Sequence, residues 1–157
     1  MSGIDHAALE AVLTAETAAL RTLCAALVEQ KAALLDQGPY SLLAAVSTVE
    51  GQARRLQALE EERGALAVRS GRGATWAALC ADSPEPYRAR LALLRADAQG
   101  LVAQIGAINA DIRELAATGV SFADRYLSTL RPALRQTYPP PGGRPAGAGG
   151  SLLNSGA

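Results

Sequence analysis

Apolar residues recur along the chain at alternating spacings of three and four, the period of a helix that packs lengthwise on a neighbour. From Leu9 onward, six of the eight positions at these spacings are leucine, and the exceptions are Glu16 and Gln30. A first helix is therefore predicted over residues 4–36. The pair Gly38-Pro39 is expected to end it, with glycine as a left-handed cap and proline opening the next helix.

A second helix is predicted over residues 39–69, because Leu42, Val49 and Leu66 continue the same spacing. Three consecutive glutamates, Glu60 to Glu62, lie on this helix. They indicate either a solvated helix face or a contact for a basic partner, and the solvated face is the more common of the two. The second helix is therefore expected to pair with the first along its leucine side.

Two glycines within residues 70–73 predict a loop after the second helix. Residues 75–80 are expected to form a short helical turn. The apolar side of this turn consists of Trp76 and Leu79, which are predicted to cap the end of the bundle. The turn therefore connects the helical hairpin to a third long helix.

The third helix is predicted over residues 84–131, with Ser83 as its cap and Pro84 in its first position. Apolar residues keep the three-four spacing along almost the whole of it. At 1.5 Å per residue, it would be about 72 Å long, roughly 20 Å longer than either of the first two helices. The excess falls after about Leu115, so this end of the helix has no equally long neighbour.

The excess part of the third helix keeps an apolar stripe. Its members are Phe122, Tyr126, Leu127, Leu130 and Leu134. A stripe without an internal partner implies an external one, either a bound protein or a second copy of the chain. A bend near Gly119 is an open alternative, because glycine weakens a helix, and the helix could then fold back and cover itself.

These elements predict an all-α protein: an antiparallel three-helix coiled-coil-like bundle with an extended third helix and a disordered C-terminal tail. Alanine and leucine together supply 57 of the 157 residues and build the scaffold. The helical domain is expected to cover residues 1–138. Residues 139–157 contain four prolines and six glycines, too little apolar material for a core, and form the predicted tail.

Charge and composition exclude several classes of protein. Fifteen basic and fifteen acidic residues give no net charge, which argues against a nucleic-acid binder and against a polybasic membrane-surface protein. The longest uncharged stretches before the tail, such as residues 98–110, are too short to span a bilayer, so no membrane insertion is expected. With no secretory signal pattern in residues 1–10 and two isolated cysteines, a cytoplasmic location is predicted.

Candidate chemistry is sparse, and no enzyme, cofactor or metal site is predicted. His6 is the only histidine and is expected at a frayed N-terminus, where nothing would orient it for catalysis. Cys24 lies beside the apolar stripe of the first helix and is expected to be a small buried hydrophobe. A thiol-dependent enzyme using Cys80, which is close to Asp82, is an alternative with little support.

The order of the segments is distinctive. The second helix contains ALEEERGAL (residues 58–66) and the third contains AINADIREL (residues 107–115). YLSTLRP (residues 126–132) and Tyr138 follow, and LLN (residues 152–154) stands near the end of a glycine-rich tail. Together these segments resemble the FlgN family, the flagellar type III export chaperones for hook–filament junction proteins. The resemblance covers nearly the whole chain, although each motif alone is weak.

The resemblance implies specific partners. Such chaperones bind the C-terminal region of hook-associated proteins, prevent premature assembly and deliver these substrates to the export gate. By this resemblance, Phe122, Tyr126, Leu127, Leu130 and Leu134 would anchor an amphipathic substrate helix. Tyr138 matches the tail tyrosine that is associated with docking to the cytoplasmic domain of the export gate, although a run of prolines follows it here. A chain that is monomeric or forms a weak homodimer is expected.

One alternative function stays open from the sequence. The apolar end of the third helix could pair with a second copy, which would make the chain a self-associating coiled-coil scaffold without an export role. Similarly, Tyr138 could simply pack on the third helix rather than contact the export gate. Both alternatives concern the same end of the chain, after about Leu115, where the predicted helices no longer have internal partners.

Overall fold

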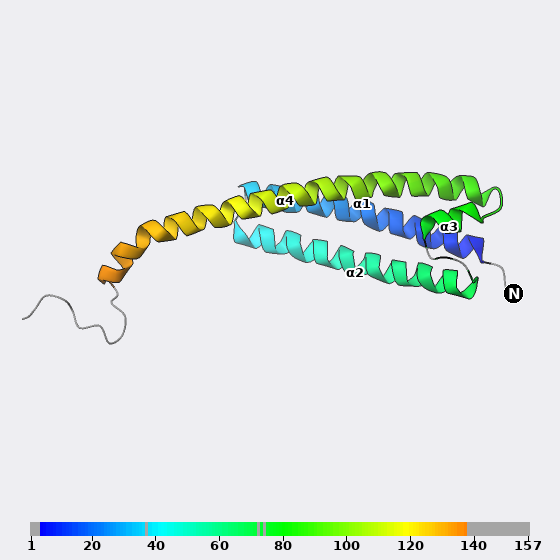
Figure 1. Cartoon of the computed structure of the whole chain (residues 1–157), viewed down its shortest axis with the longest axis horizontal. Helices are drawn as coiled ribbons and strands as arrows, with labels where there is room; N and C mark the ends of the chain where they lie inside the picture. Colours follow the sequence, from blue (N-terminus) through cyan, green and yellow to red (C-terminus); the bar gives the residue numbers. More distant parts are fainter. Residues whose placement is uncertain (1–3, 37, 72, 74, 138–157) are drawn as a thin grey trace, which may run out of the picture. The chain divides into compact units, whose positions relative to one another are not determined.

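The computed structural model describes residues 4–36, 38–71, 73 and 75–137, with side chains for all of these except 36 and 133–137. Four helices follow one another in this part of the chain: α1 (His6–Asp36), α2 (Pro39–Arg69), α3 (Trp76–Ala81) and α4 (Tyr87–Thr137) (Figure 1). The predicted all-α class is confirmed. The described chain has four helices rather than three, because the turn predicted at residues 75–80 is a short helix.

Helix α1 begins two residues later than predicted, because Asp5 caps it. The Asp5 carboxylate accepts hydrogen bonds from the backbone N–H groups of Ala7 and Ala8, at 3.1 and 3.0 Å. These N–H groups have no partner inside the helix, so an acidic side chain just before the first turn satisfies them. Helical structure then runs without interruption to Asp36.

The connection from α1 to α2 is confirmed in position but differs in geometry. Pro39 opens α2, as predicted. Gly38 is not a left-handed cap of the preceding helix, since its φ and ψ of −68° and 171° are extended. It is instead the residue before the first turn of α2, and its carbonyl accepts the N–H groups of Ser41 and Leu42. Among the described glycines, the left-handed one is Gly71, with a φ of 67°, in the predicted loop after α2.

Helix α3 closes one end of the bundle, as the sequence predicted. Thr75 caps it by accepting a hydrogen bond from the N–H of Ala78. Leu79 is 1% exposed, and Trp76 packs against the same cluster of buried residues. The buried members of this cluster are Ile4, Leu9, Leu13, Ala67, Leu79, Cys80 and Leu91. Residues from all four helices therefore meet at this end of the chain's first unit.

Helix α4 is shifted at both ends relative to the prediction of residues 84–131. It begins at Tyr87, and Ser83 does not cap it: the Ser83 hydroxyl donates to the carbonyl of Leu79 at 2.7 Å, so it completes the end of α3 instead. At the other end, Pro132 does not stop the helix, which continues to Thr137. Proline costs one helical hydrogen bond, but its fixed φ is compatible with helical backbone.

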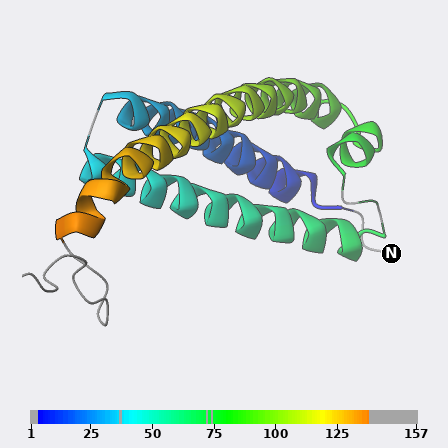
Figure 2. The same ribbon diagram turned by 60° about the vertical axis from the view of Figure 1, so that its left-hand side comes forward.

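Helix α1 has both α2 and the first part of α4 as neighbours (Figures 1 and 2). It runs antiparallel to α2 and parallel to α4. The parallel pairing is shown by three contacts in which the α4 residue is 76 to 80 positions later in sequence: Arg21–Asp97, Cys24–Gln104 and Lys31–Asp111. Because α1 has two neighbouring helices, it also buries Val12, Ala19, Ala26 and Ala33 beside its leucine seam.

The chain divides into two compact units, Met1–Ala116 and Ala117–Ala157. The predicted domain boundary at residue 138 lies outside the described residues and stays a prediction. In the first unit, α4 buries Leu91, Ala98 and Leu101, and its last partly buried position is Leu115. Every residue from Ala116 to Thr129 is exposed. The second unit therefore begins where the burial of α4 ends.

By length and composition alone, two helices could cross a membrane, residues His6–Leu35 and Tyr87–Pro132. This finding differs from the prediction that no segment is long enough, which counted only uninterrupted uncharged residues. The window in α1 is 44% buried inside the structure and that in α4 is 17% buried. Two such helices are weak evidence for a span, because the core helix of a soluble protein meets the same criterion.

Candidate protein-binding surface

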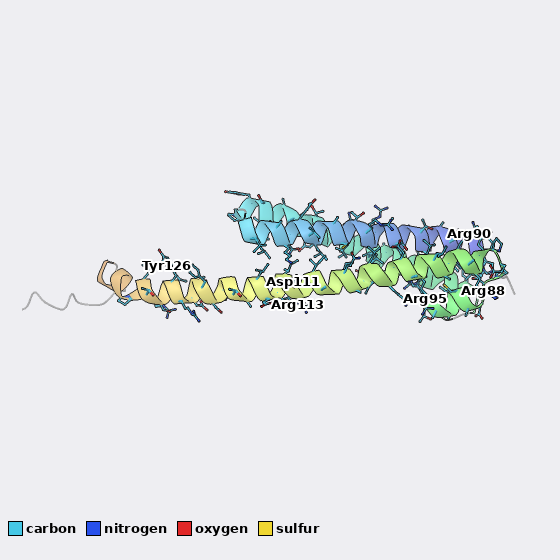
Figure 3. All side chains as sticks on the ribbon, turned by 90° about the horizontal axis from the view of Figure 1, so that it is seen from above. Arg88, Arg90, Arg95, Asp111, Arg113 and Tyr126 are labelled. Carbon is cyan, nitrogen blue, oxygen red and sulfur yellow. The ribbon has the colours of Figure 1, made fainter. Side chains whose placement is uncertain are left out.

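The described second unit consists of the end of α4, and it exposes large apolar side chains in a helical row. Phe122 is 72% exposed, Tyr126 59% and Leu127 50%. Figure 3 shows the Tyr126 side chain on this part of α4. We call the predicted set Phe122, Tyr126, Leu127, Leu130 and Leu134 the distal stripe. Phe122, Tyr126 and Leu130 follow one another at intervals of four, so they lie on one side of the helix.

The remaining members of the distal stripe are placed by the structure to different extents. Leu130 is partly buried and lies in the helix one turn after Tyr126. Leu134 also lies within α4, but its side chain is outside the described set. Tyr138, the predicted contact for the export gate, lies outside the described residues. The structure therefore brings Phe122, Tyr126, Leu127 and Leu130 together on one helix.

The helix does not fold back near Gly119. Backbone structure is helical from Tyr87 through Gly119 to Thr137, and Val120, directly after this glycine, is 63% exposed. A methyl group added at Gly119 would meet nothing within 4 Å. The alternative in which the third helix covers its own stripe is therefore wrong for the described residues, and the stripe is open to a partner.

Several large apolar residues of the first unit are also exposed, on α1, α2 and α4. Tyr40 on α2 is 86% exposed, Val68 on α2 77% and Leu93 on α4 73%. Single exposed apolar residues are normal on soluble domains. Leu93 matters here because it lies on the same helix as Phe122 with nearly the same exposed fraction, which makes it a matched control.

A buried polar cluster that the sequence analysis did not single out lies in the first unit. Glu16 is 3% exposed. One of its carboxylate oxygens, Oε2, accepts hydrogen bonds from Nη1 of Arg63 at 2.7 Å and from Nε1 of Trp76 at 2.9 Å. The other oxygen, Oε1, and Nε of Arg63 are buried without a hydrogen-bond partner. Glu16 thus joins α1, α2 and α3 through a single oxygen.

Glu16 also lines an open cleft of about 390 Å³ in the first unit. The wall of the cleft is mostly apolar, and the residues that line it are Glu16, Leu20, Leu56, Glu60, Arg63, Trp76, Arg95, Ala98, Gln99 and Val102. Burial raises the pKa of the Glu16 carboxyl above its ordinary value, although the charge of Arg63 and the Trp76 hydrogen bond act in the opposite direction. In the sequence, the only sign of this buried cluster is that Glu16 occupies a position where leucine otherwise recurs.

The single histidine is held by neighbours rather than frayed, contrary to the prediction. The His6 ring stacks on Tyr87 with 5.4 Å between ring centroids, and its Nδ1 lies 3.4 Å from the Ser83 hydroxyl. The guanidinium group of Arg90 lies over the Tyr87 ring, 4.9 Å from its centroid, and forms an ion pair with Glu10 at 3.2 Å. Because Ser83 is fully buried and donates to a backbone carbonyl, this arrangement packs the chain and does not expose a nucleophile.

The two cysteines give no sign of a reactive thiol. Cys80 is 7% exposed, and burial raises the pKa of its thiol, although the nearby charge of Arg95 acts in the opposite direction. Cys24 is partly buried and its Sγ lies 3.7 Å from Oε1 of Gln104. Among the described residues, no group of three histidine, cysteine or acidic side chains is arranged to hold a metal ion.

Comparison with known proteins identifies the family. A family model described as FlgN protein matches residues 1–146, nearly the whole chain. The chain belongs to the FlgN family. Neither a search of curated proteins nor a search of solved structures gave a match. FlgN is a family of flagellar export chaperones that act on hook-associated proteins and is not known as enzymatic.

Family membership changes how the exposed end of α4 is interpreted. In an isolated bundle, a row of exposed Phe122, Tyr126 and Leu127 side chains would be costly without a partner. In a FlgN-family chaperone, a surface that takes up another protein is required. Three of the five residues predicted as substrate anchors, Phe122, Tyr126 and Leu127, are among the large apolar residues exposed on α4.

Proposed function

We propose that this chain is a cytoplasmic flagellar type III export chaperone. It binds the C-terminal region of hook-associated proteins, the hook–filament junction proteins, prevents their premature assembly and delivers them to the export gate. Two findings support the proposal: the match to the FlgN family over residues 1–146, and the distal stripe. The observation that carries it is the exposure of Phe122, at 72%, on a helix whose apolar side is used for packing in the first unit.

The distal stripe is suited to take up an amphipathic helix. Removing a large apolar side chain from water contributes about 1.5–3 kcal/mol. Phe122, Tyr126, Leu127 and Leu130 together are therefore enough to offset much of the cost of association, which is on the order of 4–15 kcal/mol. A substrate helix would bind this row through its own apolar face. While it is bound, that face is covered and is not available for assembly.

Tyr138 is proposed to contact the cytoplasmic domain of the export gate. The support is its place in the sequence, directly after the end of α4 and four residues beyond Leu134. A contact at this position would lie next to the bound substrate in sequence but would not use the residues that hold it. Replacing Tyr138 should therefore impair delivery while leaving substrate affinity unchanged.

The free chain is proposed to be a monomer or a weak homodimer. The alternative is a scaffold in which the distal stripes of two copies form a stable pair, and exposure of the stripe by itself is compatible with both. Light scattering of the purified chain separates them. A tight dimer that weakens on Phe122→Asp and Leu130→Asp, with no affinity for hook-associated proteins, would favour the scaffold.

The direct test is the affinity of the full chain for a hook-associated protein, measured by calorimetry. Phe122→Asp combined with Tyr126→Asp should abolish detectable binding, because it places two charges in the apolar contact. Leu93→Asp is the matched control on α4, since Leu93 is 73% exposed and outside the stripe. The control should bind like the wild type. Equal affinities for the double variant and the wild type would refute the proposal.

A further inference from the structure

The neutral net charge conceals an uneven distribution along the chain. Of the 15 acidic residues, only Asp124 lies after Glu114. Four of the 15 basic residues lie there, namely Arg125, Arg131, Arg135 and Arg144. The first 116 residues therefore hold 14 acidic and 11 basic residues, whereas the segment that carries the distal stripe is basic.

Two of these arginines stand on opposite sides of the distal stripe. Arg125 directly precedes Tyr126 and Arg131 directly follows Leu130. Successive residues are about 100° apart around a helix, so the two arginines lie along opposite edges of the apolar row. Both arginines are exposed, and within the described part of the chain neither has a carboxylate at ion-pair distance.

Several cations of the first unit are arranged differently, because they pair with a carboxylate on a neighbouring helix. Lys31 on α1 pairs with Asp111 on α4 at 2.6 Å, and Arg90 on α4 pairs with Glu10 on α1 at 3.2 Å. Figure 3 shows Arg90 and Asp111 on α4, beside α1. Where α4 packs on α1, these charged side chains thus meet opposite charges. At the distal stripe the opposite charges have to come from the partner.

The same arrangement disfavours parallel pairing between two copies. If two distal stripes met in parallel, Arg125 of one copy would lie beside Arg131 of the other. Like charges across a helical interface are destabilising. A second copy packed in parallel is therefore a poor occupant of the stripe, and an acidic partner is a good one.

We propose that the partner segment that docks on the distal stripe is an amphipathic helix with acidic side chains on both sides of its apolar face. The inference rests on the proposed function and specifies the chemistry of its substrate. An anionic bilayer would also attract arginines, but the stripe continues the three-four spacing with which α4 packs on helices in the first unit. That spacing fits the side of a helix better than a lipid surface.

The test uses the full chain and two synthetic amphipathic helices that share one apolar face. One helix carries glutamate along both edges of that face, and the other carries lysine at the same positions. The acidic helix should bind about tenfold more tightly than the basic one, and raising the salt concentration should weaken it. Arg125→Glu combined with Arg131→Glu should reverse the preference. Arg54→Glu combined with Arg55→Glu, an equal charge change at exposed positions of α2, should leave it intact.

Three results would overturn the inference. These are equal affinity for the two helices, no binding of either, or binding of the chain to vesicles of anionic phosphatidylglycerol but not to the acidic helix. A hook-associated protein, titrated in parallel, separates this inference from the proposed function. If that protein binds through the stripe but is insensitive to Arg125→Glu with Arg131→Glu, only the charge inference fails. If the acidic helix binds and no hook-associated protein does, only the proposed function fails.

Discussion

The indole N–H of Trp76 on α3 donates a hydrogen bond to Oε2 of Glu16 on α1, over 2.9 Å. This bond joins the short helix at the end of the bundle to a carboxylate that is almost completely buried. Arg63 on α2 donates to the same oxygen. The position of α3 is therefore fixed by a polar contact as well as by the apolar packing of Leu79.

Trp76→Phe should reduce the free energy of unfolding by about 2 kcal/mol, because it removes a hydrogen bond to a buried charge while keeping an aromatic ring. Urea unfolding followed by circular dichroism measures the change. Val68→Ala on α2, at a residue that is 77% exposed, is the control and should have little effect. An unchanged unfolding midpoint for Trp76→Phe would show that the Arg63 hydrogen bond alone is sufficient for Oε2 of Glu16.

Stability should depend on pH through Glu16. Burial raises the pKa of this carboxyl above its ordinary value of 4.5, so the folded chain holds the proton more tightly than the unfolded chain does. The contribution of this tighter proton binding to the free energy of unfolding is fully present below pH 4.5. It is lost as the pH rises through the higher pKa of the folded state. Glu16→Gln removes this titration.

The measurement is the urea stability of the wild type and of Glu16→Gln from about pH 4 to about pH 7. The stability of the wild type relative to the variant should fall as the pH rises. A relative stability that increases with pH would mean that Arg63 and Trp76 outweigh burial and lower the pKa of Glu16.

Cys80 should react slowly with alkylating reagents. Burial raises the pKa of its thiol and limits access to it, so little reactive thiolate is present near neutral pH. The rate of its reaction with iodoacetamide, followed by mass spectrometry, should be below that of glutathione under the same conditions. A faster reaction than glutathione would restore the thiol-enzyme alternative.

Two leucines on α4 should separate stability from binding. Leu91 is fully buried, and Leu91→Ala should cost about 2–5 kcal/mol of unfolding free energy. Leu127 is 50% exposed, and Leu127→Ala should change stability by no more than about 0.5 kcal/mol but weaken substrate binding. Urea unfolding and calorimetric titration of both variants check this. A large stability loss for Leu127→Ala would place the distal stripe in the core.

Much of the fold follows from local signals in the sequence. The three-four spacing predicted α1 and α2 almost to their ends, and Pro39 marked the start of α2 because proline is favoured in the first turn of a helix. The greater predicted length of the third helix placed the loss of internal partners after about Leu115, where burial of α4 does end. These features depend on residues close together in sequence, so periodicity alone reveals them.

Other features depend on contacts that periodicity does not encode. Ser83 looked like a cap for the helix after it, but a hydroxyl that follows one helix and precedes another can serve either, and here it bonds to Leu79. His6 looked frayed until Tyr87, far along the chain, proved to lie against it. The register of α1 against α4, which pairs Lys31 with Asp111, likewise appears only in three dimensions.

Amide hydrogen exchange of the full chain, alone and with a hook-associated protein, tests the central claim most directly. In the free chain, amides of residues 117–131 should exchange faster than those of the buried part of α4 around Leu91, because few tertiary contacts hold them. On addition of the hook-associated protein, exchange should slow in residues 117–131 and stay nearly unchanged in the first unit. Protection confined to the first 116 residues would contradict the account.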